Sequence, residues 1–179
     1  MAEVRFRLLG PVEVSVDGRP LALGATKQRA LLAMLALSPN TVVSADRLME
    51  GLWGEHPPAS ASKMVQLYVS QLRKRLSGAD GAEIVTRGRG YELRVNPDAV
   101  DVVRAEALVG ERSQARAAAA LFCGPPLADV ADEPFAAQAI RRLEELRARA
   151  LLAALEGDVA GGRHDAALPE IEALLAEDP

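Results

Sequence analysis

Hydrophobic and polar residues alternate with a period of two at the front of the chain. This alternation, with its Val, Phe and Leu content, predicts β-strands at residues 4–9 and 11–16. Asp17 and Gly18 then form a strong turn signal, after which a third short strand is expected at 19–23. We therefore expect a small antiparallel sheet, in which no residue suggests chemistry.

The hydrophobic period lengthens to that of an α-helix after residue 25. Thr26 is expected to cap a helix that reaches about Leu37, and Ser44 to cap a second helix over 45–53. A Gly- and Pro-containing stretch at 54–58 breaks the chain before a third helical pattern. Three helices in this order are typical of a helix-turn-helix protein with a long second connection.

The third helical pattern, residues 60–77, contains no acidic residue although the whole chain has a net charge of −4. One face forms an apolar stripe directed at the core, made of Val65, Val69, Leu72 and Leu76. The other face is polar and basic with one leucine, and it comprises Lys63, Gln66, Leu67, Ser70, Gln71, Arg73 and Lys74. A solvated surface helix can have this pattern. It is also the pattern of a helix that enters the DNA major groove, where an isolated leucine can contact a thymine methyl group.

A basic hairpin is expected directly after this helix. Two β-rich runs between residues 84 and 95 flank the sequence Arg87-Gly88-Arg89-Gly90. Such a tip can lie along phosphates or enter the minor groove, and it could equally be an ordinary solubilising hairpin. The sequence lacks the third glycine and the following helix of a phosphate-binding loop.

The remainder of the chain, residues 98–179, is expected to be all-helical. A long Ala-rich helix is predicted over 100–122, and a second is predicted to start at 132–134, with Pro134 in its first turn, and to end near 159. A last helix over 165–176 would pack back against it as in a tetratricopeptide-like pair. The two halves also differ in charge. Residues 1–97 carry 13 Lys and Arg against 9 Asp and Glu, whereas residues 98–179 carry 8 against 16, which suits a polyanion partner for the first and a protein partner for the second.

Few residues are available for catalysis. The two histidines, His56 and His164, fall in different predicted domains, and Cys123 has no histidine near it in the sequence and is expected to be a buried small hydrophobe. No zinc-ligand spacing and no P-loop is present, so we expect no enzyme, no cofactor and no metal. A single cysteine fits a reducing cytosol, and neither a signal peptide nor a membrane-spanning stretch is apparent, so a cytoplasmic protein without membrane contact is expected.

The order sheet, three helices and basic hairpin resembles the OmpR-type winged-helix DNA-binding domain over residues 1–97. Residues 69–76 look like its recognition-helix motif, and residues 86–91 look like its wing. The resemblance implies base contacts from Leu67 and Gln71, contacts mainly to phosphates from Ser70, Arg73 and Lys74, and a minor-groove contact from Arg87. On the same basic surface we also expect Lys63 and Arg89 to contact phosphates and Gln66 to contact base edges. Many relatives have Arg in place of Gln71, and an amide there would favour adenine over guanine.

Residues 124–135, followed by Arg142-Leu143-Glu144-Glu145-Leu146, look like the bacterial transcriptional activation domain of the SARP family, the pathway-specific activators of antibiotic gene clusters. The stretch between Asp101 and Gly124 looks a helix shorter than usual, and the chain stops at Pro179 where relatives continue, so a shortened form of this domain is expected over 98–179. The fold class is thus α+β, a winged helix followed by an all-α domain.

The resemblance implies an activator that binds promoter direct repeats as a homodimer on double-stranded DNA and contacts RNA polymerase. The alternatives are a helical protein–protein adaptor whose winged helix does not bind DNA, and a repressor with the same DNA contacts.

Overall fold

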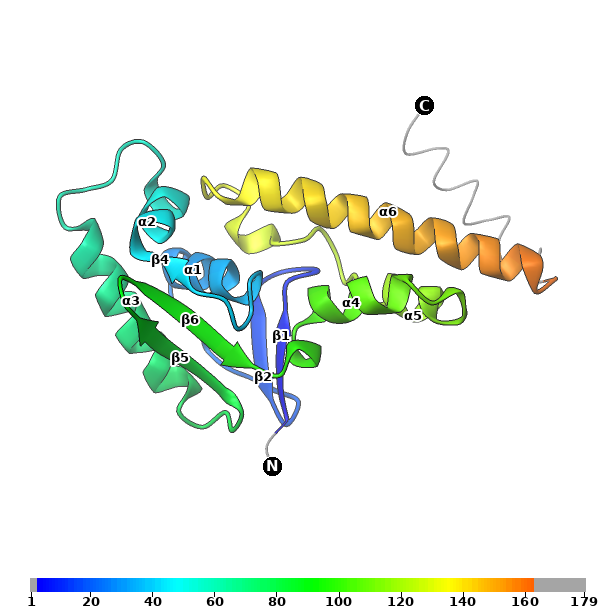
Figure 1. Ribbon diagram of the computed structural model, residues 1–179, viewed down its shortest axis with the longest axis horizontal. Helices are drawn as coiled ribbons and strands as arrows, with labels where there is room; N and C mark the ends of the chain where they lie inside the picture. The colour runs from blue at the N-terminus through cyan, green and yellow to red at the C-terminus, as the bar shows by residue number, and fades with distance from the viewer. Residues whose placement is uncertain (1–2, 163–179) are drawn as a thin grey trace.

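The computed structural model describes residues 3–162, in which two small sheets and a set of helices form two packed units (Figure 1). The winged-helix unit starts with an antiparallel sheet of β1 (Val4–Arg7), β2 (Glu13–Val16) and β3 (Arg19–Pro20). Asp17 and Gly18 both have positive φ angles, 50° and 75°, as a type I′ hairpin turn requires. The sequence-based prediction of this sheet and its turn is confirmed.

The strands are shorter than the sequence predicted. Leu8, Leu9 and Val12 are buried, but their N–H groups donate to the side chains of Asp101 and Asp129 and not to a neighbouring strand. The strand predicted over 4–9 therefore ends early, at Arg7, and the strand predicted over 11–16 begins late, at Glu13, because carboxylates far along the chain replace the ladder hydrogen bonds. The third strand, predicted over 19–23, has two residues.

Three helices follow: α1 (Thr26–Ala36), α2 (Ala45–Trp53) and α3 (Ala61–Leu76). Ser44 caps α2 as predicted, since its side chain accepts a hydrogen bond from the N–H of Arg47 at 3.1 Å. The predicted Thr26 cap is wrong: Ala25 occupies the capping position, and Thr26 is already helical and makes no cap bond. The stripe Val65, Val69, Leu72 and Leu76 is buried in the core beneath α3, as its spacing predicted.

The predicted basic hairpin is present as β5 (Ala82–Arg87) and β6 (Gly90–Val95), which pair antiparallel with Arg87 opposite Gly90. A two-residue strand that the sequence did not predict, β4 (Val43–Ser44), adds to the other edge of β6 and gives the order β4-β6-β5. The hairpin is thereby fixed to the segment that leads into α2, and it lies alongside α3 (Figure 1).

The helical unit contains α4 (Asp101–Val109), α5 (Ala115–Ala119) and α6 (Ala136–Ala160), with three short 3₁₀ turns at Pro97–Ala99, Arg112–Gln114 and Ala128–Val130. The single helix predicted over 100–122 is wrong, because α4 ends at Val109 and the chain turns before α5, whose buried Ala115 and Ala118 pack against α6. Figure 1 shows α6 lying along α4 and α5.

The helix predicted to start at 132–134 begins instead at Ala136. Asp132, Glu133 and Pro134 belong to the preceding loop, where Glu133 is buried and paired with Lys27, so it does not serve the helix N-terminus. The predicted helix at 165–176 lies outside the described residues. No helix within residues 3–162 is both long enough and apolar enough to cross a membrane.

Candidate nucleic-acid interface

The outward side of α3 carries five exposed side chains, which we call the α3 face: Lys63, Gln66, Leu67, Ser70 and Lys74. Leu67 lies among them with 52% of its surface exposed, an unusual position for a large apolar residue in a chain that buries most of its leucines. Within residues 3–162, none of these five side chains has a hydrogen bond or ion pair to an acidic residue. No described acidic group neutralises the cations of this face.

The wing presents Arg87 and Arg89. Arg87 is about half exposed, and its Nε lies 3.3 Å from a carboxylate oxygen of Glu92 across the hairpin. Gly88 starts the two-residue turn with a φ of +56°, and Arg89 is exposed beside it. The backbone at Arg89 is anchored, because the N–H of Ala45 donates to the carbonyl of Arg89 at 2.9 Å. The wing tip is therefore held against the start of α2.

Gly90 allows this anchoring. A Cβ atom at this position would lie 2.5 Å from the carbonyl oxygen of Val43, closer than any real Cβ contact. Glycine is thus required where β6 pairs with β4, because the two backbones approach closely there and not because the φ angle is unusual.

Arg73 and Arg75 of α3 make contacts within the chain. Arg73 donates from Nε to the carbonyl of Ile84 at 2.7 Å and from Nη2 to Oγ1 of Thr86 at 2.8 Å. It therefore braces α3 against β5 and fixes the wing beside the helix. Arg75 donates to the carbonyl of Ala22 on the opposite flank.

Gln71 is half-buried and does not stand free on the α3 face. Its Oε1 accepts a hydrogen bond from Nε2 of Gln28, a buried residue of α1 that is 7% exposed. Gln28 could not be identified from the sequence, because a single amide in an apolar helical pattern does not indicate which residue it contacts. The structure thus brings Lys63, Gln66, Leu67, Ser70 and Lys74 together as predicted, places Arg73, Arg87 and Arg89 beside them, and ties Gln71 to a second helix.

Charged groups also join the two units on the side away from the α3 face. Lys27 forms an ion pair of 2.6 Å with the buried Glu133 and donates to the carbonyl of Leu52 at the end of α2. Arg29, two residues further along α1, pairs with Asp129 at 2.5 Å. These contacts, together with the hydrogen bond from the N–H of Phe135 to the carbonyl of Gly51 at 3.1 Å, form what we call the seam.

Asp101, the first residue of α4, reinforces the same connection. Its carboxylate accepts hydrogen bonds of 2.8 Å and 3.0 Å from the N–H groups of Leu8 and Leu9. Burial raises the pKa of Asp101 to about 6, against the lowering effect of the backbone hydrogen bonds from Leu9, Leu8 and Val102. Protonation of this group therefore falls near the physiological range.

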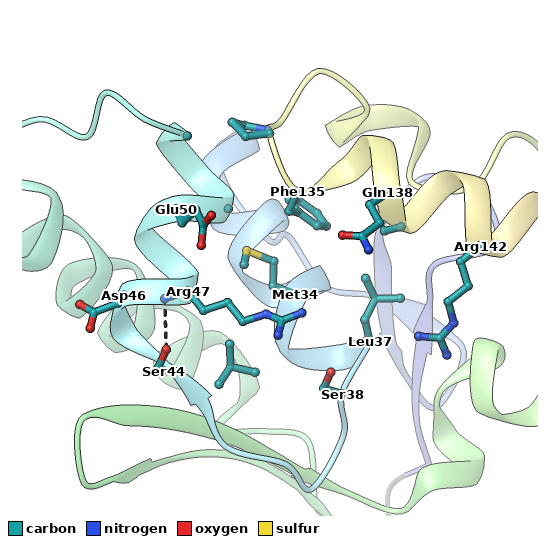
Figure 2. A pocket seen from close by; sticks show the side chains of 15 residues that line it. Met34, Leu37, Ser38, Ser44, Asp46, Arg47, Glu50, Phe135, Gln138 and Arg142 are labelled. Atoms are coloured by element: carbon teal, nitrogen blue, oxygen red, sulfur yellow. Dashed lines mark hydrogen bonds between the residues drawn. The ribbon is translucent and has the colours of Figure 1, made fainter.

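A pocket of about 770 Å³ opens along the seam between α1, α2 and the start of α6 (Figure 2). Met34 and Phe135 lie at its centre, and the long side chains of Arg47 and Arg142 extend from α2 and α6 respectively. No residue of α3 lines it, so the pocket and the α3 face are separate. Cys123 was expected to be buried and is exposed. No three His, Cys, Asp or Glu side chains gather as metal ligands in the part of the chain that the structure describes.

A winged helix whose third helix is basic and uncovered, followed by a helical unit, defines a class of DNA-associated regulators, and comparisons with known proteins agree. Residues 18–93 match the family described as "Transcriptional regulatory protein, C terminal", and residues 94–179 match the "Bacterial transcriptional activator domain". The regulatory protein DnrI of Streptomyces peucetius is 34% identical over 197 residues, covering 98% of this chain and 72% of DnrI. The regulatory protein AfsR of Streptomyces coelicolor is 37% identical over 190 residues, covering 98% of this chain and 19% of AfsR.

The transcriptional regulatory protein EmbR of Mycobacterium tuberculosis is 36% identical over 190 residues, covering 97% of this chain and 49% of EmbR. The solved structure of that EmbR in complex with a low-affinity phosphopeptide superimposes with a TM-score of 0.90, at 34% identity, over 100% of this chain and 52% of the EmbR chain. The chain thus spans about half the length of EmbR. It belongs to the SARP family of transcriptional regulators.

Proposed function

We propose that this chain binds specific duplex DNA through the α3 face and the wing, and that it activates transcription of a secondary-metabolite gene cluster of the antibiotic type. The observation that carries the proposal is Leu67, exposed among Lys63, Gln66, Ser70 and Lys74 on a helix that contains no acid. In the free protein, exposing the apolar surface of this leucine to water is unfavourable in free energy. It is explained by contact with an apolar group on a polyanion, such as a thymine methyl in the major groove.

The contacts divide into two kinds. Lys63, Lys74 and Arg89 supply charge to phosphates, and Arg73 does so from a position fixed by its hydrogen bonds to β5. Ser70 also contacts the backbone. Leu67, Gln66 and Gln71 face base edges. Arg87 enters the adjacent minor groove, where the negative potential of the DNA replaces its ion pair with Glu92.

In the same proposal residues 1–97 bind DNA, and residues 98–179 contact RNA polymerase and a second protomer bound to an adjacent direct repeat. The seam supports these separate roles for the two units, since it holds the helical unit on the side of α1 and α2 away from the α3 face. DNA on α3 and a protein on the helical unit would therefore not compete for space.

A two-stage experiment tests the proposal. Genomic fragments that the chain retains are selected first, and a fluorescent duplex from the enriched motif is then titrated with the parent and with Leu67→Glu and Leu152→Glu. Leu152 is the matched control, because it is a similarly exposed leucine on α6, at 59% against 52% for Leu67. Leu67→Glu should abolish specific binding and Leu152→Glu should leave it unchanged; equal affinities for all three would refute the use of the α3 face. A reporter driven by the selected promoter then separates activation, expected as increased output, from repression.

A further inference from the structure

We propose that Gln28 is a positioning residue that turns the amide of Gln71 so that only its NH₂ group faces the DNA, and that Gln71 therefore recognises guanine. This inference rests on the proposed function, because it specifies how one residue of the recognition helix reads a base. It concerns a residue on α1 that has no place on the α3 face itself.

The first step is the contact between the two amides. Nε2 of Gln28 on α1 donates to Oε1 of Gln71 on α3, and this hydrogen bond joins two residues that are 43 positions apart in the chain. Gln28 is buried, whereas Leu67 and Lys74, one turn before and one turn after Gln71 on α3, are both exposed. Gln71 thus has one end of its amide drawn toward α1 and the other directed to the side where DNA would lie.

The second step is the direction of the Gln28 amide. A Cβ atom on Gly24 would lie 1.8 Å from Oε1 of Gln28 and 2.9 Å from Nη2 of Arg75, so both groups border the same small space. Arg75 is held there by its hydrogen bond to the carbonyl of Ala22. Oε1 of Gln28 is buried and has no hydrogen-bond partner among residues 3–162. The adjacent guanidinium of Arg75 stabilises a carbonyl oxygen at that end and disfavours an NH₂ group. The NH₂ group of Gln28 is left to face Gln71.

The third step is what Gln71 can still offer. A glutamine amide has one carbonyl oxygen and one NH₂ group with two donors. Bidentate recognition of adenine needs both, since adenine presents an acceptor at N7 and a donor at N6. With Oε1 turned inward to Gln28, the outward group of Gln71 is a pair of donors. Guanine has two neighbouring acceptors, N7 and O6, in the major groove, and is the base that matches. The adenine preference expected from an unassisted amide is thereby reversed.

Selection from a randomised duplex library with the full chain tests the inference. Four variants accompany the parent: Gln71→Ala, Gln28→Met, Gln28→Glu and the control Gln138→Met, which changes an exposed glutamine of α6. The position read by Gln71 is the one whose base preference the Gln71→Ala variant loses. Methionine keeps the length and helical preference of Gln28 but cannot form the hydrogen bond.

The parent and Gln138→Met should select guanine at that position. Gln28→Met should shift the ratio of affinities for guanine and adenine duplexes about tenfold toward adenine, because Gln71 can then present both ends of its amide. Gln28→Glu should favour bases with a donor, adenine or cytosine, since a carboxylate accepts from the NH₂ group of Gln71 and turns its oxygen outward.

Three results would overturn the inference. Selection of adenine by the parent would show that the amide faces the other way. An unchanged base preference in both Gln28 variants, with affinity reduced equally for all duplexes, would give Gln28 a purely structural role. If the parent enriched no motif at all, the proposed function would itself have failed, and the inference would fail with it. This outcome differs from the first two because no base preference could then be measured for any variant.

Discussion

Lys27 and Glu133 form an ion pair between the two units, with Nζ of the lysine 2.6 Å from Oε2 of the glutamate. The glutamate is buried, and the lysine also donates to the carbonyl of Leu52 and lies 5.8 Å from the centre of the Trp53 ring. One side chain of α1 therefore connects the end of α2 to the loop before α6. The seam depends on this lysine more than on any exposed pair, because a buried carboxylate needs a charged partner.

Replacing the glutamate of this pair should destabilise the chain. Glu133→Gln leaves Lys27 without its carboxylate and should lower the free energy of unfolding by about 2 kcal/mol, between the values for exposed and fully buried pairs. The measurement is urea denaturation followed by far-UV circular dichroism. Glu83→Gln is the matched control, because it breaks an exposed pair of 3.4 Å with Arg94 and should cost less than about 0.5 kcal/mol. An equal decrease in the free energy of unfolding for both variants would show that the Lys27–Glu133 pair stabilises the chain no more than an exposed pair does.

Asp101 should make stability depend on pH. Its pKa is about 6 in the folded chain and ordinary, near 4, in the unfolded chain, so the folded state binds more protons between these values. Its contribution to stability is fully present below about pH 4 and is lost as the pH rises through 6, by on the order of 3 kcal/mol.

The parent and Asp101→Asn should be compared by urea denaturation from pH 4 to 7, because their difference cancels the other carboxylates. The stability of the parent relative to the variant should fall across this window. A difference that stays constant with pH would show that the Asp101 carboxylate titrates equally in both states.

The wing should not tolerate a side chain at Gly90. Gly90→Ala places a methyl group 2.5 Å from the carbonyl of Val43, so β6 must separate from β4 and stability should fall by about 2 kcal/mol or more. Gly78→Ala is the control, since no atom of the described residues lies within 4 Å of a Cβ there. Hydrogen exchange of the Ala45 amide, which donates to Arg89, reports the separation directly. Retained protection in Gly90→Ala would contradict the close approach.

Arg73 should act on the wing through its hydrogen bonds as well as through its charge. Arg73→Lys keeps the charge but loses the paired geometry to Ile84 and Thr86, and should weaken wing protection and DNA affinity together. Arg149→Lys, the same exchange at an exposed arginine of α6, is the control and should change neither. DNA affinity unaltered by Arg73→Lys would mean that the brace has no bearing on binding.

The sequence predicted those parts of the fold that local periodicity and turn chemistry determine. The stripe Val65, Val69, Leu72 and Leu76 follows from helical spacing alone, and the Asp17-Gly18 turn from the positive φ angles that these residues accept. The α3 face followed in turn, because a helix with one buried side exposes the other.

What the sequence did not reveal depends on distant partners. The early end of β1 is set by Asp101, 93 residues away from Leu8, and the place of Glu133 by Lys27, 106 residues away. The break in the helix predicted over 100–122 reflects packing of Ala115 and Ala118 on α6, which local propensity does not report, since alanine favours a continuous helix. Gln28 is another residue of this kind, because its proposed role depends on its hydrogen bond to Gln71, which is distant in the sequence.

The most direct test of the central claim, that the α3 face meets a duplex, is the salt dependence of DNA binding. A fluorescent duplex carrying the selected motif is titrated at increasing salt with the parent, with Lys63→Ala and Lys74→Ala, and with Arg149→Ala as a control on α6. The account predicts a steep negative slope of log affinity against log salt for the parent and the control, and a slope smaller by about one for each lysine variant. Identical slopes for all four proteins, or no slope at all, would contradict it.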